Sequence, residues 1–195
     1  LPAGHAQGPA PALRGMPLQR SFTAESYNAT PSHPGGITTD AQGRVYVGNV
    51  EGVLRYDGSD WQRIELPGKS PARAMATGAD GRIYVGGYDT YGWLTLGDDG
   101  GLHYEDLRDA SRLKGDARQV GTVWEVLAAS NGVYFRTEHS LHYLSFDRKI
   151  AKQWPLDEKT RSFYVSGDVV YARIDGLGFC RFEDGKFTLE PGGEV

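Results

Sequence analysis

Polar and aromatic side chains gather in four short segments of this chain. Amide, carboxylate and guanidinium groups can hydrogen-bond a small polar ligand, and tyrosine rings offer a rigid amphipathic surface for stacking. The candidates for ligand binding are Asn49 and Glu51 in the first segment, Tyr88, Asp89 and Tyr91 in the second, Arg136, Glu138 and His139 in the third, and Arg173 and Asp175 in the fourth. Each set also has a structural interpretation, as rings packed between sheets, as a solvated turn, or as a local ion pair of small stabilising effect.

Residue patterns typical of catalysis or metal binding do not occur. The sequence contains no GxSxG, no HExxH and no glycine-rich phosphate loop. His139 and His142 are three residues apart, a spacing that places their side chains on opposite faces of a strand. Cys180 is the single cysteine, so no disulfide framework and no Cys/His metal spacing exists. We therefore expect no cofactor, no metal site and no enzymatic activity in these residues.

The elements that must position the four segments are internal repeats. The versions are Gly43 to Gly48 (GRVYVG), Gly81 to Gly86 (GRIYVG), Gly132 to Phe135 (GVYF) and, more faintly, Val169 to Ala172 (VVYA). Equivalent branched residues in them are separated by about 38, 50 and 37 positions. Such a period is typical of radial β-repeats.

Each repeat predicts a meander of four strands. In the first, Val45 and Val47 alternate with Arg44 and Tyr46, which is the pattern of a half-buried strand. Turns rich in Asp, Asn and Gly separate this strand from three others. A single meander cannot bury both of its faces, so neighbouring meanders must stack around a common axis.

The sequence therefore predicts an all-β fold, a β-propeller built of four-stranded antiparallel blades. About four blades are expected, as part of a larger propeller: residues 37–68, 72–109, 123–157 and 160–191, within a propeller segment of residues 18–195. The segment from Leu18 to Thr23 could add an outer strand to a closing blade. Residues 1–17 are rich in Pro, Ala and Gly and are expected to form a disordered leader that follows a removed signal peptide.

Composition narrows the possible partners. The net charge is −4, with 39% hydrophobic and 24% charged residues. The chain has no basic stripe, which argues against nucleic acid as a partner. It also has no apolar run of the roughly 18 to 20 residues that a membrane-spanning helix needs.

The order of residues within the repeats resembles the two-component regulator propeller repeat. Members of that family run from a glycine, an apolar–aromatic–apolar triplet and a second glycine to a Tyr-Asp-Gly turn, as Gly43 to Gly58 does here. Ile83 to Leu94, with its doubled glycine, is similar to another blade of the same family. The later repeats depart from the pattern, since Arg136-Thr137 stands where the first repeat has Gly48-Asn49.

The resemblance implies a periplasmic sensor region of a bacterial membrane-bound histidine kinase, diguanylate cyclase or hybrid regulator. We accordingly expect a non-catalytic extracytoplasmic domain that binds a small extracellular ligand, such as a carbohydrate or an anionic metabolite, and passes the event to a cytoplasmic output. A membrane anchor in the full-length protein and pairing with further blades or with a second copy are also expected. Two other function classes stay open: a carbohydrate-active propeller enzyme or lectin, and a protein-interaction scaffold.

The expected binding face follows from strand order. If the strands of each blade run outward from the axis, the loops between second and third strands share one face with the connections between blades. The longest connection, Leu107 to Thr122, carries Arg108, Arg112, Lys114 and Arg118. This positive charge would favour an anionic ligand on that face.

Overall fold

The structure, a computed structural model, describes residues 19–32, 35–108 and 120–194. The expected leader at residues 1–17 lies outside the described residues, as do Arg112, Lys114 and Arg118 of the long connection. Helical structure within the described residues consists of the single turn α1 (Ala24–Tyr27) and a 3-10 turn at Pro67–Lys69. No described helix is long and apolar enough to cross a membrane.

Sixteen strands form four antiparallel sheets, each with its strands in sequence order. Blade 1 contains β1 (Ile37–Thr39), β2 (Val45–Asn49), β3 (Gly52–Tyr56) and β4 (Trp61–Ile64). Blade 2 contains β5 (Ala74–Thr77), β6 (Ile83–Gly86), β7 (Tyr91–Leu96) and β8 (Leu102–Asp106). Blade 3 contains β9 (Glu125–Ala128), β10 (Gly132–Arg136), β11 (Ser140–Ser145) and β12 (Ala151–Pro155). Blade 4 contains β13 (Thr160–Ser166), β14 (Val169–Ile174), β15 (Gly178–Glu183) and β16 (Lys186–Leu189).

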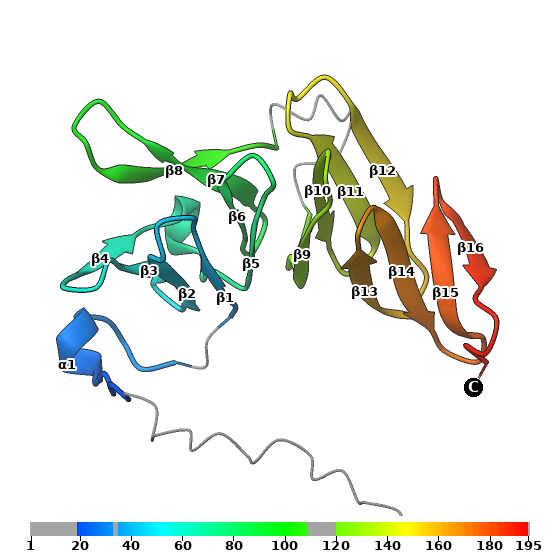
Figure 1. Cartoon of the computed structure of the whole chain (residues 1–195), viewed down its shortest axis with the longest axis horizontal. Helices are drawn as coiled ribbons and strands as arrows, with labels where there is room; N and C mark the ends of the chain where they lie inside the picture. The colour runs from blue at the N-terminus through cyan, green and yellow to red at the C-terminus, as the bar shows by residue number, and fades with distance from the viewer. Residues whose placement is uncertain (1–18, 33–34, 109–119, 195) are drawn as a thin grey trace, which may run out of the picture.

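The four sheets stand side by side along an arc, as Figure 1 shows. Their first strands β1, β5, β9 and β13 contact one another in that order, so they line the inner side of the arc. The arc does not close into a ring among the described residues. This arrangement confirms the prediction of an all-β propeller with four-stranded meander blades, four of which are present.

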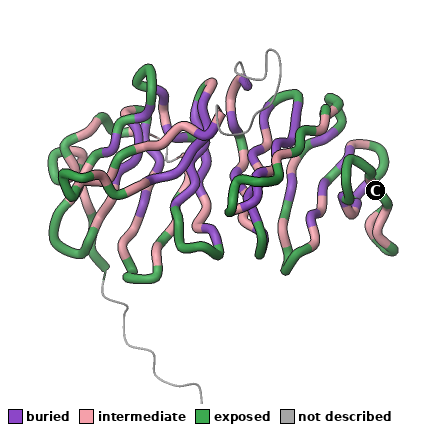
Figure 2. Tube along the Cα trace, turned by 90° about the horizontal axis from the view of Figure 1, so that it is seen from above, coloured by how far each residue is buried: buried purple, intermediate pink, exposed green. Residues whose placement is uncertain are grey.

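Every blade has a front face and a rear face, which the repeats define. The front face carries the repeat tyrosine of the second strand: Tyr46, Tyr84, Tyr134 or Tyr171. The rear face carries the branched or aromatic residues on either side of it. Three hydrophobic clusters join the front of one blade to the rear of the next. Buried positions accordingly run along the strands, while the hairpin tips are mostly exposed (Figure 2).

The segment before β1 does not form the expected strand. Residues 19–23 lie outside any strand, and the segment instead packs on the rear face of blade 1. The ring of Phe22 lies 4.8 Å from that of Tyr56 and 5.2 Å from that of Trp61, and Tyr27 lies 5.8 Å from Trp61. Burying these rings against aromatic partners stabilises the segment on this face. The expected outer strand from Leu18 to Thr23 is absent among the described residues 19–23.

Candidate functional site

The loops between second and third strands lie on the same side of the arc as the connections between blades, because the strands of each meander alternate in direction. Hydrogen bonds join these loops and connections in blade 2. The Tyr88 amide donates to Ser70 Oγ at 2.7 Å, and the Gly121 amide donates to Asp89 Oδ1 at 2.7 Å. The loop of blade 2 is thus fixed between the connection that precedes its blade and the one that follows it.

A cleft of about 580 Å³ opens on this side, between the connection that precedes blade 2 and the loop that follows β6. It is lined by Pro67, Gly68, Lys69, Ser70, Pro71, Arg73, Tyr88, Asp89, Thr90 and Arg108. Its volume falls within the range of about 300 to 1,000 Å³ that is usual for small-molecule sites. Prolines and an aromatic ring form its apolar part, and the remainder consists of charged side chains together with Gly68, Ser70 and Thr90.

Positive charge predominates in the cleft. Lys69 and Arg73 are exposed and make no ion pair with any described residue. Arg108 is bound by Asp106, with Nη2 to Oδ2 at 2.6 Å, and this carboxylate raises the pKa of the Arg108 guanidinium. Asp89 is the single acidic residue of the lining. The cleft therefore offers two uncompensated cations next to the exposed ring of Tyr88.

The three residues expected from the blade 2 loop take different places. Tyr88 is 59% exposed and lines the cleft. Asp89 also lines it, and its backbone adopts a left-handed φ of 49°. Tyr91 is only 1% exposed, because the loop ends at Thr90 and Tyr91 begins strand β7, where its ring stacks on Phe135 at 4.6 Å. Assigning Tyr91 to a ligand-binding loop is wrong, since the side chain packs between blades 2 and 3.

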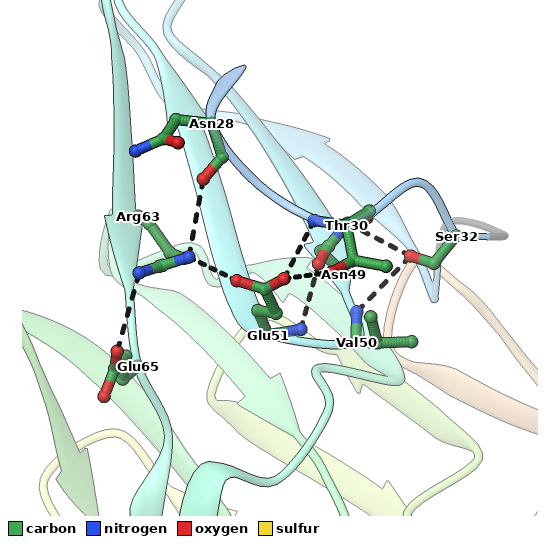
Figure 3. A network of polar contacts seen from close by, with 8 residues as sticks. All are labelled: Asn28, Thr30, Ser32, Asn49, Val50, Glu51, Arg63 and Glu65. Carbon is green, nitrogen blue, oxygen red and sulfur yellow. Dashed lines mark hydrogen bonds and ion pairs between the residues drawn. The ribbon is translucent and has the colours of Figure 1, made fainter. Parts of the chain in front are cut away.

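Asn49 and Glu51 bind another part of this chain (Figure 3). Asn49 is buried, and its Nδ2 donates 3.0 Å hydrogen bonds to the Thr30 carbonyl and to Ser32 Oγ. Glu51 accepts a 2.8 Å hydrogen bond from the Thr30 amide and forms an ion pair with Arg63. These bonds, those from Thr30 first, lower the pKa of Glu51. The two residues hold the segment before β1 in place. Burial of Asn49 corrects its assignment to a ligand site, whereas Glu51 also lines a surface pocket with Thr30 and Arg63.

In the blade 3 loop, one of the three expected residues also binds another part of the chain. Arg136 is half-buried, and its Nη2 donates to the Thr160 carbonyl of blade 4 at 3.2 Å. Glu138 and His139 are exposed, and the Glu138 carboxylate lies close to Gly121 of the long connection. These two side chains are therefore available on the same side as the cleft, next to the connection that holds Asp89.

Beneath that loop lies a buried polar cluster that the sequence pattern did not reveal. Ser140 Oγ lies 2.7 Å from His142 Nε2, and both Thr137 and His142 are almost completely buried. Burial lowers the pKa of His142 from 6.5 to about 4, so the imidazole is neutral at ordinary pH. Its Nδ1 has no hydrogen-bond partner among the described residues. Because no carboxylate of the described residues orients this ring, the pair lacks the third member of a nucleophilic triad within that part of the chain.

Arg173 and Asp175 do not pair with each other. The Arg161 Nε donates to Asp175 Oδ2 at 2.5 Å, and this guanidinium lowers the pKa of Asp175. Arg173 is exposed on the front face of blade 4. The structure thus spreads the ten expected residues over four blades and brings only Tyr88 and Asp89 into one cleft. The cations beside them, Lys69 and Arg73, belong to a connection in which the sequence pattern marks no binding residue.

Comparison with known proteins identifies solved structures with a similar fold. No protein-family model matches the chain, and no curated protein sequence matches it. Among solved structures, the extracellular domain of a protein described as a hybrid two-component system from B. thetaiotaomicron is 16% identical, with a TM-score of 0.60 over 87% of this chain and 22% of that chain. Virginiamycin B lyase from Staphylococcus aureus is also 16% identical, with a TM-score of 0.57 over 78% of this chain and 53% of that one.

A third structure, described as a gluconolactonase, is 14% identical with a TM-score of 0.52 over 83% of this chain and 65% of that chain. The chain therefore spans between about a fifth and two thirds of the length of these structures. At these identities the likeness concerns the fold. The fold is shared by a sensory domain and by enzymes.

The occurrence of this fold in enzymes corrects the expectation about enzymatic activity. The prediction that these residues carry no enzymatic activity is wrong as an inference from missing motifs, because structures of the same fold include a lyase and a protein described as a lactonase. A propeller can assemble a site from loops of several blades, so the absence of a local catalytic motif does not exclude an activity.

Proposed function

We propose that this chain is part of the extracytoplasmic sensory domain of a bacterial signal-transduction protein and that the cleft beside the blade 2 loop recognises a small anionic molecule. Two observations support the sensory role. The first two blades resemble the two-component regulator propeller repeat, and the fold is similar to that of an extracellular domain of a two-component system. In this proposal the domain lies in the periplasm, and a kinase or cyclase elsewhere in the full-length protein supplies the output.

The observation that carries the ligand assignment is the pair of uncompensated cations at the cleft. Lys69 and Arg73 come from the connection between blades 1 and 2, and the exposed ring of Tyr88 lines the same cleft. Guanidinium and ammonium groups bind carboxylate or phosphate through charge-assisted hydrogen bonds. A neighbouring tyrosine ring suits a planar or apolar portion of the same molecule. The expected ligand is therefore a compact organic anion.

Thermal unfolding in the presence of candidate anions tests this proposal. Binding to the folded state stabilises it by about 2.7 kcal/mol when the ligand is at 100 times its Kd. Inorganic phosphate, a dicarboxylate, an aromatic carboxylate and a neutral monosaccharide form a suitable panel. We expect an anion to raise the melting temperature, and Arg73→Ala or Lys69→Ala to reduce that rise. An equal response to the neutral sugar, or no response to any anion, would contradict the assignment.

The matched control is Lys149→Ala, which removes one exposed positive charge from the hairpin between β11 and β12, on the other side of the arc. This variant changes the net charge by the same amount as Lys69→Ala. Ligand-induced stabilisation should be unaffected in it. A loss of the response in all three variants would indicate a general charge effect rather than a site.

A second candidate function is catalysis at the same cleft, which the likeness to virginiamycin B lyase favours. The two functions differ in the fate of the bound molecule. A compound that stabilises the chain should be incubated with it and analysed by mass spectrometry. Recovery of the intact compound supports sensing, whereas a product whose formation depends on Arg73 and Lys69 supports catalysis.

A further inference from the structure

A second pocket lies between blades 3 and 4, at the hairpin tips on the side of the arc away from the first cleft. Its volume is about 300 Å³, which is at the lower end of the usual range for small-molecule sites. Blade 3 contributes the rings of Tyr134, Tyr143 and Trp154 to the lining. Blade 4 contributes the carboxylates of Asp168 and Asp184. Aromatic rings combined with carboxylates suit a positively charged ligand.

The three rings lie next to one another on the front face of blade 3. Tyr134 and Tyr143 are paired across β10 and β11, and their ring centroids are 4.8 Å apart. The centroid of Trp154 lies 6.4 Å from that of Tyr134, with the two ring planes 25° apart. All three side chains are half-buried, and the Tyr134 hydroxyl makes no hydrogen bond with any described residue. The rings are therefore held in place by one another and remain partly accessible from the pocket.

The preceding junction, between blades 2 and 3, shows what occupies the equivalent space elsewhere in the chain. There the hairpin between β11 and β12 reaches over the front face of blade 2. The ring of Phe146 stacks on that of Tyr84 at 5.9 Å. The Arg148 guanidinium lies 5.1 Å from the centre of the Trp93 ring and pairs with Glu105 at 3.1 Å. A cation of the chain itself thus lies on an aromatic ring beside a carboxylate.

The equivalent hairpin of blade 4 is shorter and leaves this space open. Residues 145–150 connect the last paired positions of β11 and β12, whereas Asp184 and Gly185 alone connect β15 to β16. In register with the second strand of its blade, Asp184 stands where blade 3 has Phe146. A carboxylate thus replaces the ring that covers the repeat tyrosine. Among the described residues of blade 4, none places a cation over the rings of blade 3.

The pocket has more negative than positive charge. Lys152 is the one basic side chain of its described lining; its Nζ donates to Asp184 at 2.8 Å and lies 5.8 Å from the centre of the Trp154 ring. Both members of this ion pair are exposed, so the pair contributes little to stability. Asp168 accepts a 3.2 Å hydrogen bond from the Ser130 amide and forms no ion pair with any described residue. Its charge is therefore uncompensated.

We propose that this pocket binds a quaternary ammonium ion, with the positive charge on the rings of blade 3 and beside Asp168, as Arg148 lies on Trp93 at the preceding junction. The faces of tyrosine and tryptophan rings attract such a cation electrostatically. Ring faces are poor hydrogen-bond acceptors, so they favour a cation without N–H groups. This site is separate from the anion cleft, since it lies on the other side of the arc and has the opposite charge.

An NMR titration of the whole chain with choline measures the affinity, and the indole N–H signal of Trp154 reports where the cation binds. The ligand control is 3,3-dimethyl-1-butanol, in which a neutral carbon atom replaces the charged nitrogen of choline. We expect the Trp154 signal to shift on addition of choline and to stay in place with the alcohol. No shift with choline, or equal shifts with the two compounds, would overturn the proposal.

Exposed substitutions then test the charges of the pocket. Asp168→Asn keeps an acceptor for the Ser130 amide and removes the charge, so it should weaken choline binding several-fold. Lys152→Gln removes the competing ammonium and should strengthen binding. Asp98→Asn is the matched control, because Asp98 is exposed in the hairpin between β7 and β8, on the same side of the arc but outside the pocket. Arg73→Ala, which alters the anion cleft, should bind choline as the wild type does. Unchanged affinity in Asp168→Asn, or an equal loss in Asp98→Asn, would overturn the assignment of this site.

Discussion

The hydroxyl of Tyr84 donates a 2.8 Å hydrogen bond to the Asp80 carboxylate. Tyr46 donates an equivalent bond to Asp40 at 2.9 Å. In both blades the aspartate also accepts a hydrogen bond from a backbone amide of its own turn, so it links the hairpin between the first two strands to the repeat tyrosine of the front face. The repeated sequence thus encodes a repeated contact between turn and interface.

Replacing Tyr84 by Phe should lower the free energy of unfolding by about 1.5 to 3 kcal/mol, the usual value for a hydrogen bond to a charged group. The ring would remain packed between blades 2 and 3, so the loss measures the hydroxyl alone. Urea denaturation provides the value. Tyr88→Phe is the control, because Tyr88 is exposed and its hydroxyl bonds no described residue. Equal losses in both variants would contradict a special role for the Asp80 contact.

The buried imidazole of His142 should make stability depend on pH. Its pKa is about 4 in the folded protein, because burial disfavours the charged form. The ordinary pKa of a solvent-exposed histidine is 6.5. The unfolded chain therefore binds a proton that the folded chain does not, and stability falls as the pH decreases from about 6.5 to about 4. The full loss is on the order of 3 kcal/mol.

Urea denaturation at several pH values, compared between the wild type and His142→Gln, isolates this effect. The glutamine retains an acceptor for Ser140 Oγ but cannot take up a proton in this range. The variant should show a flatter dependence between pH 6.5 and pH 4, with carboxylates accounting for what remains. Identical slopes in the two proteins would show that His142 is not the group responsible.

Glu51 should control the order of the segment before β1. Glu51→Ala removes the acceptor of the Thr30 amide and one partner of Arg63, so we expect faster amide hydrogen exchange over residues 22–32 and little change in the blades. Glu65→Ala is the matched control, since Glu65 pairs with the same arginine at 3.8 Å but does not contact the segment. Comparable exchange in the two variants would assign the effect to Arg63 rather than to Thr30.

The sequence predicted the strands because their side chains alternate. It did not predict that both faces of a blade pack against neighbours, since the alternation placed Tyr46 on the polar face of a half-buried strand and the ring is only 2% exposed. The candidate site was harder to predict. The loop after β6 ends at Thr90, since the Gly87 amide donates to the Thr90 carbonyl, and this end leaves Tyr91 inside a strand. No local sequence pattern reveals the Gly87–Thr90 hydrogen bond that ends this loop.

Long-range contacts account for the other differences. Asn49 and Glu51 have the residue types of a binding loop, yet their partners at Thr30 and Ser32 lie about twenty positions earlier in the chain. Lys69 and Arg73 carry no motif at all. They become candidates only because folding places their connection beside the loop of Tyr88.

Gly48 and Gly86 illustrate a second role of glycine, besides forming turns. They stand two residues after the repeat tyrosines on the front faces, where the next blade approaches most closely. A Cβ at Gly86 would lie 2.3 Å from Val123 Cγ1, and one at Gly48 would lie 2.6 Å from the Ala72 carbonyl oxygen. The repeat glycine therefore permits close contact between blades, and its neighbour differs between the two sites.

Gly86→Ala should accordingly destabilise the protein by about 1 to 3 kcal/mol through overpacking. Val123→Ala alone should destabilise it as well, by leaving a cavity. Because the methyl groups removed from Val123 include the atom nearest to the new Cβ, the double variant should lose less stability than the sum of the two single changes. Gly48→Ala has no such rescue, since a backbone carbonyl cannot be truncated. Urea denaturation of the four variants measures the coupling, and strict additivity of Gly86→Ala and Val123→Ala would contradict a direct contact between blades 2 and 3 at this point.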